Sequence, residues 1–301
     1  MVRSNTADKI FEITLYIFAF LLILIVVGFF FELLINSLPS IKSFGFSFLF
    51  NSKWNPVKEI FGALPFIVGT LITSILAVLV SSPISIGTAI FIDEYVNKRF
   101  SNLFSSLIEI LAAIPSVIYG LWGIFFIVPI VRKIEFFFYN NFSYIKIFRS
   151  QPSGVGIMSA VVILCIMIIP YTVSVCKELL KLVPGDQLEA GYSLGITKWE
   201  VISKIKLPYI RSGLFAGIGL SLGRALGETM AVTMLIGNRN ALPLSIFDPS
   251  NTLASVIANE FNEATGTMHL SSLIELGLIL FLITFIINIL MRITLKRLVN
   301  K

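Results

Sequence analysis

The sequence has little charge, little cysteine and one histidine, and each of these shortages excludes a class of protein or site. Charged residues make up 13% of the 301 positions, whereas a soluble domain carries about 25%. The two cysteines, Cys165 and Cys176, lie near one apolar segment at a spacing that matches no metal motif. His269, the only histidine, is a single ligand where a zinc site needs several. We therefore expect a membrane protein without a metal site, in which both cysteines are packing residues.

The chain also lacks the features of ATP-binding subunits and of outer-membrane barrels. It has no G-x-x-x-x-G-K-[ST] phosphate loop, so any ATP site must lie on another subunit. The alternating segments that form barrels are absent as well. No internal repeat divides the chain, so we expect one domain over residues 1–301. We expect neither catalytic residues nor a cofactor in it.

Long apolar segments dominate instead, since 56% of the residues are hydrophobic and the mean hydropathy is +0.92. A membrane-spanning helix needs about 20 apolar residues. The segments that satisfy this lie near residues 10–36, 62–92, 105–131, 154–178, 212–236 and 272–295. The second segment is long and contains Pro83, which predicts a kink or a break there. The expected fold is an all-α integral membrane protein with six transmembrane helices.

The distribution of lysine and arginine predicts the orientation of the chain. These residues are more frequent on the side that is cytoplasmic if the N-terminus is inside. Both termini and the 179–211 loop are then cytoplasmic, and the formal net charge of +6 needs no nucleic-acid partner. The basic 132–153 loop is the exception, because it is predicted to lie outside. Its run IEFFFYNNFSYIKIF is typical of an aromatic belt at the membrane surface.

The 179–211 loop contains the signals of two short helices. Asp186–Glu189 has the form of a capping box with Pro184 before it, so a helix should start there. Gly195 suits the left-handed residue that ends such a helix. Thr197–Glu200 is a second capping box and should start a second short helix.

Apolar residues at the turn between these helices predict contact with a soluble partner. Leu194, Ile196 and Trp199 lie where the chain should be wet, and exposed apolar groups rimmed by charge mark an interaction site. Pro208 should close the unit before the next span. The alternative is an amphipathic loop on the membrane surface, whose lysines contact anionic lipid. That alternative requires neither two caps nor a fixed turn.

The spacing of this loop resembles a known motif. Residues 189–208 read EAGYSLGITKWEVISKIKLP, which resembles the EAA loop of ABC-importer permeases, EAA-x3-G-x9-I-x-LP. The departure is Gly191, where the family usually has alanine. The resemblance implies the fold of type I importer permeases and a coupling-helix pair that docks in a groove of an ATPase dimer. The implied coupling residues are Glu189, Ala190, Gly191, Leu194, Gly195, Ile196, Trp199, Leu207 and Pro208.

Charged and small residues share the predicted fifth span. Arg224 and Glu228 are four residues apart, so they lie on one helical face and can pair. Gly219, Gly223 and Gly227 form two G-x-x-x-G steps, which let a neighbouring helix approach closely. Charges inside a bilayer normally face a bundle interior or a water-filled path. We therefore expect a substrate path in which Arg224 binds an oxyanion such as phosphate and otherwise pairs with Glu228; a purely structural salt bridge is the alternative.

Three further segments narrow the resemblance. RALGETMAV followed by GN, FGALPFIVGTLITS at 61–74 and IPSVIYGLWG at 114–123 resemble the PstC-type membrane subunits of phosphate-specific ABC importers. The resemblance implies that Arg224 and Glu228 take part in phosphate passage. It also implies a bacterial inner or plasma membrane location. The implied partners are a second, PstA-type permease, the ATPase dimer and a periplasmic or lipid-anchored phosphate-binding protein.

Other functions remain open at this stage. The chain could import another oxyanion, such as sulfate or molybdate. A secondary transporter or channel that works alone should show inverted repeats and paired broken helices, which the sequence lacks. A scaffold that reports phosphate status to a sensor kinase would not need the Arg224–Glu228 pair.

Smaller features give further expectations. Glu109 is read as a carboxylate at the start of the third span, Tyr119 as a packing residue and Glu275 as a group facing water. The spacing of apolar residues at 253–261 predicts a short helix within the outer loop 237–271.

Overall fold

The computed structural model describes residues 6–299, and its regular secondary structure in this range is entirely helical. The longer helices are α1 (Thr6–Phe44), α3 (Leu64–Glu94), α4 (Lys98–Ala113), α5 (Ser116–Phe142), α6 (Ile157–Leu180), α9 (Leu207–Gly227) and α12 (Thr267–Val299). The shorter ones are α2 (Ser47–Phe50), η1 (Pro56–Lys58), η2 (Lys146–Phe148), α7 (Gly185–Ser193), α8 (Lys198–Glu200), η3 (Val201–Lys206), α10 (Met230–Leu235) and α11 (Leu253–Glu260). The all-α expectation is confirmed.

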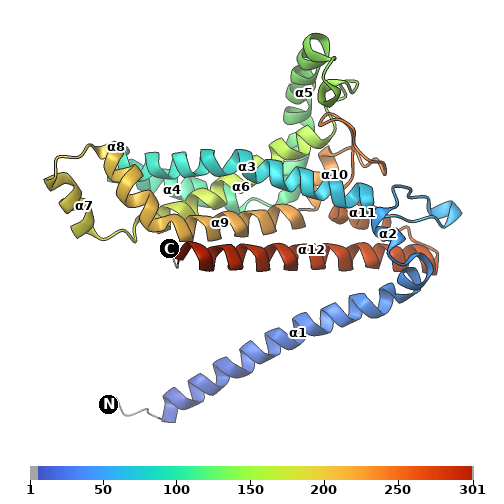
Figure 1. The fold of residues 1–301 in the computed structure, drawn as a ribbon, viewed down its shortest axis with the longest axis horizontal. Helices are drawn as coiled ribbons and strands as arrows, with labels where there is room; N and C mark the ends of the chain where they lie inside the picture. Colours follow the sequence, from blue (N-terminus) through green and yellow to red (C-terminus); the bar gives the residue numbers. More distant parts are fainter. Residues whose placement is uncertain (1–5, 300–301) are drawn as a thin grey trace.

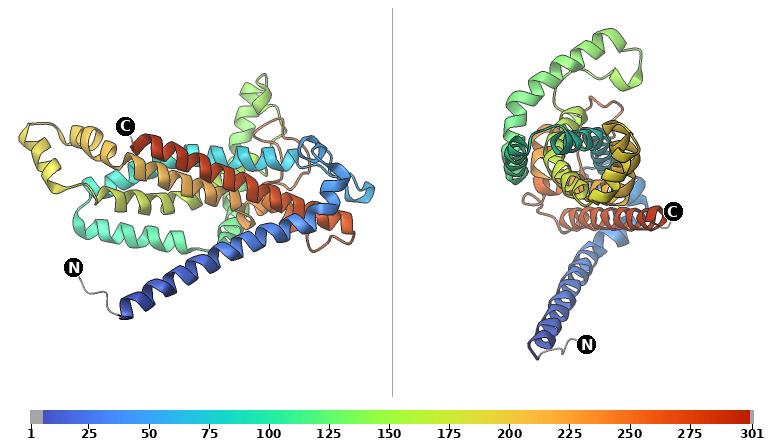
Figure 2. Two further views of the ribbon diagram at one scale, coloured as in Figure 1. Left: turned by 60° about the horizontal axis from the view of Figure 1, so that its bottom comes forward. Right: turned by 90° about the vertical axis from the view of Figure 1, so that its left-hand side faces the viewer.

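Four helices form the centre of the molecule. α3, α6, α9 and α12 lie side by side, with α7 and α8 at one end and α11 at the other (Figures 1 and 2). Small buried residues such as Ala77 and Ala225 bring α3, α6 and α9 together around Leu164 and Ile168. Cys165 is buried in the same cluster, and Cys176 is buried in the neighbouring one. The reading of the cysteines as packing residues is confirmed.

Five helices of the described range are long and apolar enough to cross a membrane: α1, α3, α5, α6 and α12. They cover the predicted first, second, third, fourth and sixth spans at least in part. α9 lies in the bundle between α6 and α12 (Figure 1). It carries much of the predicted fifth span, but it is not among the five. The count of six spans therefore stays a prediction.

The predicted third span, residues 105–131, is wrong as a single helix. α4 ends at Ala113, and α5 starts at Ser116. Ile114 is extended, with φ −64° and ψ 130°, because a residue before proline is pushed out of the helical region, and Pro115 follows it. At the end of α4, the carbonyl of Leu111 accepts a hydrogen bond of 2.8 Å from the Tyr119 hydroxyl in addition to one of 3.3 Å from the amide of Ile114.

The predicted 132–153 loop is also wrong over much of its length. α5 continues to Phe142, and its second half projects from the bundle (Figures 1 and 2). The aromatic run extends the helix instead of ending it. Glu135 is fully buried there and accepts a hydrogen bond of 2.7 Å from the amide of Gly154. This contact ties α5 to the segment that leads into α6.

α3 shows no break at Pro83. The helix runs from Leu64 to Glu94 with Pro83 inside it, so the predicted break is wrong. The neighbouring hydroxyls of Ser81 and Ser85 lie buried, and Ser85 donates to the carbonyl of Ser81 at 2.7 Å. Pro83 removes one backbone hydrogen bond, to the carbonyl four residues before it, and the rest of the helix continues.

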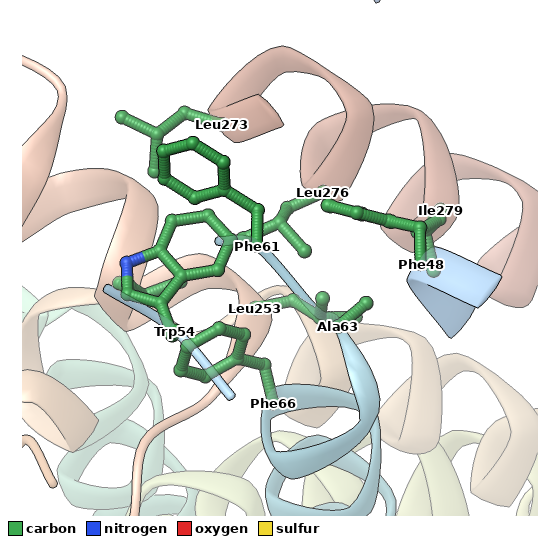
Figure 3. Packing of buried hydrophobic residues seen from close by; sticks show 10 residues of the cluster. Phe48, Trp54, Phe61, Ala63, Phe66, Leu253, Leu273, Leu276 and Ile279 are labelled. Atoms are coloured by element: carbon green, nitrogen blue, oxygen red, sulfur yellow. The ribbon is translucent and has the colours of Figure 1, made fainter. Parts of the chain in front are cut away.

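The end of the bundle opposite α7 has its own aromatic core. Trp54 packs edge-on against Phe61 and Phe66, with Leu253 and Leu276 beside them (Figure 3). The chain before α3 is thereby packed against α11 and α12. The predicted short helix at 253–261 is confirmed as α11, which starts in a capping box between Thr252 and Ser255.

Two polar residues at this end, Glu275 and His269, make contacts that the sequence did not predict. Glu275 is only 6% exposed, so the expectation that it faces water is wrong. The face of α12 that carries it packs on α1, where the hydroxyls of Ser40 and Ser272 are 3.0 Å apart. His269 contacts the carboxylate of Glu260 at 3.0 Å and stacks on Phe61.

Glycines and a serine hold α9 against α6. A Cβ built at Gly213 would lie 2.5 Å from Leu179, and one at Gly217 would lie 2.8 Å from Val175. Ser221 follows at the same spacing and forms a hydrogen bond of 2.8 Å with Thr172. Close approach of α6 and α9 therefore depends on small residues at every fourth position, as expected for helices packed in a membrane.

Replacing Gly217 by valine should destabilise the chain by about 1–3 kcal/mol, because the added atoms overfill the contact with Val175. We expect a lower midpoint of thermal unfolding for the purified protein in detergent. Gly223→Val is the matched control, since no described atom of another element lies within 4 Å of a Cβ at Gly223. Equal midpoints for the two variants would contradict this packing.

Candidate coupling segment and substrate path

Residues 185–206 form a bent helical unit at one end of the bundle, which we call the coupling segment (Figure 1). α7 ends before Gly195, whose φ of +74° is the left-handed conformation that favours glycine. At the start of α8, Thr197 accepts from the amide of Glu200, and the Glu200 carboxylate accepts from the amide of Thr197. Both of these local predictions are confirmed.

The first predicted capping box does not form. α7 begins at Gly185 with Pro184 as its N-cap residue, and no side chain caps it. Asp186 lies in the first turn of the helix, where a carboxylate still interacts favourably with the helix dipole. The sequence pattern therefore located the helix correctly and placed its N-cap two residues too late, at Asp186 instead of Pro184.

Pro208 does not close the coupling segment, which is a further correction. α8 continues through the π-helical η3 directly into α9, and Pro208 occupies the first turn of α9. Proline has no N–H to donate, so one backbone hydrogen bond is missing where η3 passes into α9, but the helix is not interrupted there. π-helical turns are rare in proteins overall, and those that occur are often found at functional sites. As a result, the coupling segment and α9 form one continuous helical element.

A groove of about 600 Å³ lies between α7 and the start of α9. It is lined by Gln187, Ala190, Gly191, Leu194, Ile196, Lys204, Ile205, Pro208 and Tyr209. Leu194 is 82% exposed and Trp199 is 63% exposed, so the predicted apolar contact surface is uncovered, with Ile196 half-buried beside it. Exposed apolar side chains in these numbers fit a docking surface for another protein.

The remaining residues that the sequence predicts to contact an ATPase lie around this groove. Gly191 is buried, and a Cβ there would lie 2.7 Å from the end of the Ile205 side chain. Leu207 packs partly into the core at the foot of α9. Glu189 and Ala190 are exposed on α7. Glycine at position 191 thus lets α7 lie close to the helix that follows it.

The cap of α8 stays charged at any physiological pH. The Lys204 amino group, 2.8 Å away, and the donors of Thr197 lower the pKa of Glu200 to about 2. Because protonation would require a pH far below neutral, the capping box persists across the physiological range.

No local sequence pattern predicts the contacts that hold the coupling segment on α3. Lys206 is buried, with its amino group 2.9 Å from Asp93 and in contact with Glu94. Lys198 lies 3.5 Å from the Glu94 carboxylate and 4.5 Å from the centre of the Tyr95 ring. Burial opposes the charge on Lys206, but the two carboxylates outweigh it and raise its pKa. We call this group of Lys198, Lys206, Asp93 and Glu94 the α3 clamp.

Arg224 and Glu228 do not pair, contrary to expectation. α9 ends at Gly227, and Glu228 is extended with ψ 125°, so the two side chains no longer share a helical face. The guanidinium of Arg224 lies 5.7 Å from the centre of the Tyr171 ring, and no ion pair joins it to Glu228 in the described residues. The Glu228 carboxylate instead lies 3.4 Å from the amide of Ala231.

The three glycines of the predicted packing stripe differ in their surroundings. Gly219 is buried, and a Cβ there would lie 2.6 Å from Met291 of α12. Gly223 and Gly227 meet no described atom of another element within 4 Å. Arg224 is exposed between them. One face of α9 is thus packed within the chain, and the face that carries Arg224 is open.

The sequence predicts Glu109 at the start of a span, and this prediction is wrong. Glu109 is exposed in the second half of α4. Tyr119 is buried, in agreement with its reading as a packing residue. Within the described residues, no group of three or more His, Cys, Asp or Glu side chains is arranged to hold a metal ion.

Residues 81–300 match the protein family described as binding-protein-dependent transport system inner membrane component. The phosphate transport system permease protein PstC of Pasteurella multocida is 46% identical over 307 aligned positions, which cover 100% of this chain and 95% of the relative. The protein of the same name from Mesorhizobium japonicum is 42% identical, with 98% of this chain and 92% of the relative covered.

Two solved structures share the fold. A chain of the bacterial alginate ABC transporter, solved with an alginate pentasaccharide-bound periplasmic protein, has a TM-score of 0.66 at 16% identity and covers 98% of both chains. A chain of the MetNI methionine ABC transporter in an inward-facing conformation has a TM-score of 0.55 at 16% identity, with 79% of this chain and 94% of that chain covered.

Proposed function

The chain belongs to the family of binding-protein-dependent transport system inner membrane components, and we propose that it is the PstC-type permease subunit of an ATP-driven importer of inorganic phosphate. The observation that carries this proposal is identity of 46% and 42%, over almost the whole chain, to two proteins named phosphate transport system permease. The chain is a transport component and not an enzyme. It would form part of the path that phosphate takes through the membrane.

The coupling segment supports an ATPase as the partner on the inner side. Leu194 and Trp199 expose apolar surface on either side of a turn. The left-handed conformation of Gly195 and the capping box at Thr197 hold this turn in one conformation. A rigid, apolar projection suits a groove on a soluble subunit. With the 179–211 loop in the cytoplasm, this subunit would be the ATPase dimer, and both chain termini would lie on the same side.

Motion of the coupling segment has two routes into the membrane helices. η3 continues into α9, which carries Arg224 near its far end, and the α3 clamp joins Lys206 to the end of α3. We infer that ATP binding and hydrolysis on the partner move α9 and α3 together. The path would then open to one side of the membrane and afterwards to the other.

The open face of α9 supports a second permease as the partner within the membrane. Arg224 is exposed, and Gly223 and Gly227 leave space beside it. An arginine exposed to lipid would be costly, so this face should border a water-filled path shared with a PstA-type subunit. A phosphate-binding protein would deliver the anion at the outer end, near α11. The likeness to the alginate transporter, solved with its periplasmic protein, is the basis for this arrangement.

Reconstitution tests the proposed function. We expect ATP-dependent uptake of labelled phosphate into liposomes that contain the chain, its second permease, the ATPase and the binding protein. The same liposomes without the ATPase should take up none. Stimulation of ATP hydrolysis, tested in turn with phosphate, sulfate and molybdate, identifies the anion. Phosphate transport by the chain alone, or stimulation by sulfate or molybdate only, would overturn the proposal.

A further inference from the structure

A polar cavity of about 340 Å³ lies between α4 and α6. It is lined by Asn102, Ser105, Ser106, Ile108, Glu109, Val173, Ser174, Lys177, Glu178 and Lys181. Since a water molecule in the liquid occupies about 30 Å³, the cavity could hold a small oxyanion together with several waters. It is near the start of α4 and the end of α6, the helix that leads into the coupling segment.

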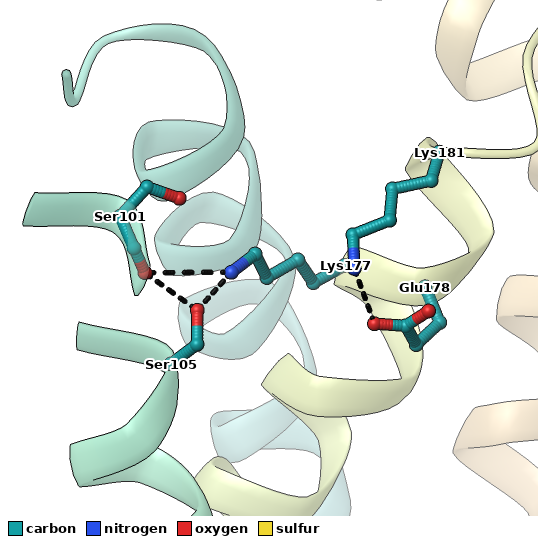
Figure 4. A network of polar contacts seen from close by, with 5 residues as sticks. All are labelled: Ser101, Ser105, Lys177, Glu178 and Lys181. Carbon is teal, nitrogen blue, oxygen red and sulfur yellow. Dashed lines mark hydrogen bonds and ion pairs between the residues drawn. The ribbon is translucent and has the colours of Figure 1, made fainter. Parts of the chain in front are cut away.

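Lys177 is the unusual residue of this cavity. It is only 9% exposed, and its side chain extends from α6 toward α4, away from Glu178 and Lys181 (Figure 4). Its amino group contacts the hydroxyl of Ser105 and lies 3.5 Å from the carbonyl of Ser101. Among the described residues, no carboxylate lies within ion-pair distance of it.

The lack of a carboxylate partner sets Lys177 apart from the neighbouring lysines. Lys181 pairs with Glu178 at 2.7 Å, which also neutralises that lining carboxylate. Lys198, Lys204 and Lys206 each contact a carboxylate as well. A buried charge without a counter-charge costs several kcal/mol. An anion in the cavity would remove this cost at Lys177.

The other lining groups restrict which anion fits. The hydroxyls of Ser105, Ser106 and Ser174 can donate to oxyanion oxygens, and an ammonium group is a common partner of phosphate. Glu109 lines the same cavity and has no ion pair in the described residues. A carboxylate repels a fully deprotonated anion but accepts a hydrogen bond from a P–OH group. Inorganic phosphate carries such a proton near neutral pH, whereas sulfate and a lipid phosphodiester do not.

We propose that this cavity binds a protonated phosphate ion, held by Lys177 and the lining hydroxyls and selected by Glu109. The assignment deepens the proposed function and rests on it for its biological meaning. With the coupling segment in the cytoplasm, the site lies at the inner end of the chain. Phosphate bound there would be the transported ion after passage or a signal of its internal level.

A thiol reporter in the intact importer tests the site by binding alone. Asn102→Cys places the reporter in the lining, and the parent chain, whose two cysteines are buried, gives the background rate. Phosphate at roughly ten times its dissociation constant should slow modification by a maleimide about tenfold. Chloride at equal ionic strength, sulfate, and phosphatidylglycerol nanodiscs without phosphate should not. Lys177→Met should abolish the protection, and Lys177→Arg should keep part of it.

Glu109→Gln gives the sharpest control, because Glu109 is exposed and its replacement should not disturb folding. This variant should gain protection by sulfate. Absence of protection by phosphate, protection by the anionic lipid alone, or equal protection by sulfate in the parent would each overturn the site. Transport of phosphate without protection would refute the site and leave the proposed function standing. Protection by phosphate without phosphate transport would support the site and refute the proposed function.

Discussion

Replacing Arg224 by glutamine should reduce phosphate uptake by the assembled importer by roughly 10- to 100-fold. One charge-assisted hydrogen bond is worth about 1.5–3 kcal/mol, and each 1.4 kcal/mol corresponds to a factor of ten. The guanidinium offers two parallel donors to a phosphate, and glutamine has neither the charge nor the fork. The measurement is ATP-dependent uptake of labelled phosphate into proteoliposomes.

The same substitution should leave assembly intact. Arg224 is exposed and forms no ion pair in the described residues. Its contact within the chain is with the face of Tyr171, and such a contact contributes about 0.5–1 kcal/mol at an exposed site. Loss of uptake with a normal yield of complex would therefore report on the path and not on folding.

Two further variants sharpen this result. Arg224→Lys keeps the charge without the fork, so we expect intermediate uptake. Arg297→Gln makes the same chemical change at an exposed position near the end of α12, and we expect unchanged uptake. Should Arg224→Gln transport as well as Arg297→Gln, the side chain would have no part in phosphate passage.

Features that depend on neighbouring residues could be predicted from the sequence. Gly195 adopts its left-handed conformation and Thr197 forms its capping box with Glu200, because each requires only a few adjacent positions. The exposure of Leu194 and Trp199 followed from the same local pattern. The break between α4 and α5 could also have been predicted, because Pro115 restricts the conformation of Ile114. The apolar residues on both sides favoured one long span instead.

Features that depend on distant contacts could not be predicted. Lys206 meets Asp93 across 113 positions of the chain, and no local pattern links them. Glu275 lies near the outer end of a predicted span, so the sequence suggests that it faces water. Its burial depends on the packing of α1 against α12, two helices that are far apart in the chain. The Arg224–Glu228 pair was predicted on the assumption of a continuous helix, which ends between them at Gly227. Where a helix ends inside a membrane is decided by its neighbours as well as by its sequence.

Replacing Lys206 by methionine should uncouple ATP hydrolysis from phosphate. Its amino group is buried between Asp93 and Glu94, and removing one partner of a buried ion pair costs about 3–5 kcal/mol, because the remaining charges lose their compensation. The coupling segment should then separate from α3. We expect loss of phosphate-stimulated ATPase activity and of uptake, while unstimulated ATP hydrolysis and binding of the ATPase persist.

A matched lysine in the same segment provides the control. Lys204 pairs with Glu200 at 2.8 Å, but both side chains are substantially exposed, and exposed helix pairs contribute only about 0.3–0.5 kcal/mol. Lys204→Met should therefore keep stimulation and uptake close to the wild-type level. The comparison separates loss of the α3 clamp from loss of one positive charge near the docking surface.

A triple variant separates coupling from stability. Replacing Lys206 by methionine, Asp93 by asparagine and Glu94 by glutamine removes the uncompensated charges, so the stability lost in the single variant should largely return. Coupling should not return, because the neutral groups no longer hold the segment on α3. If the triple variant regained phosphate-stimulated hydrolysis and uptake together with its stability, the α3 clamp would be a structural contact alone, and motion would reach the membrane helices through the continuous η3–α9 element.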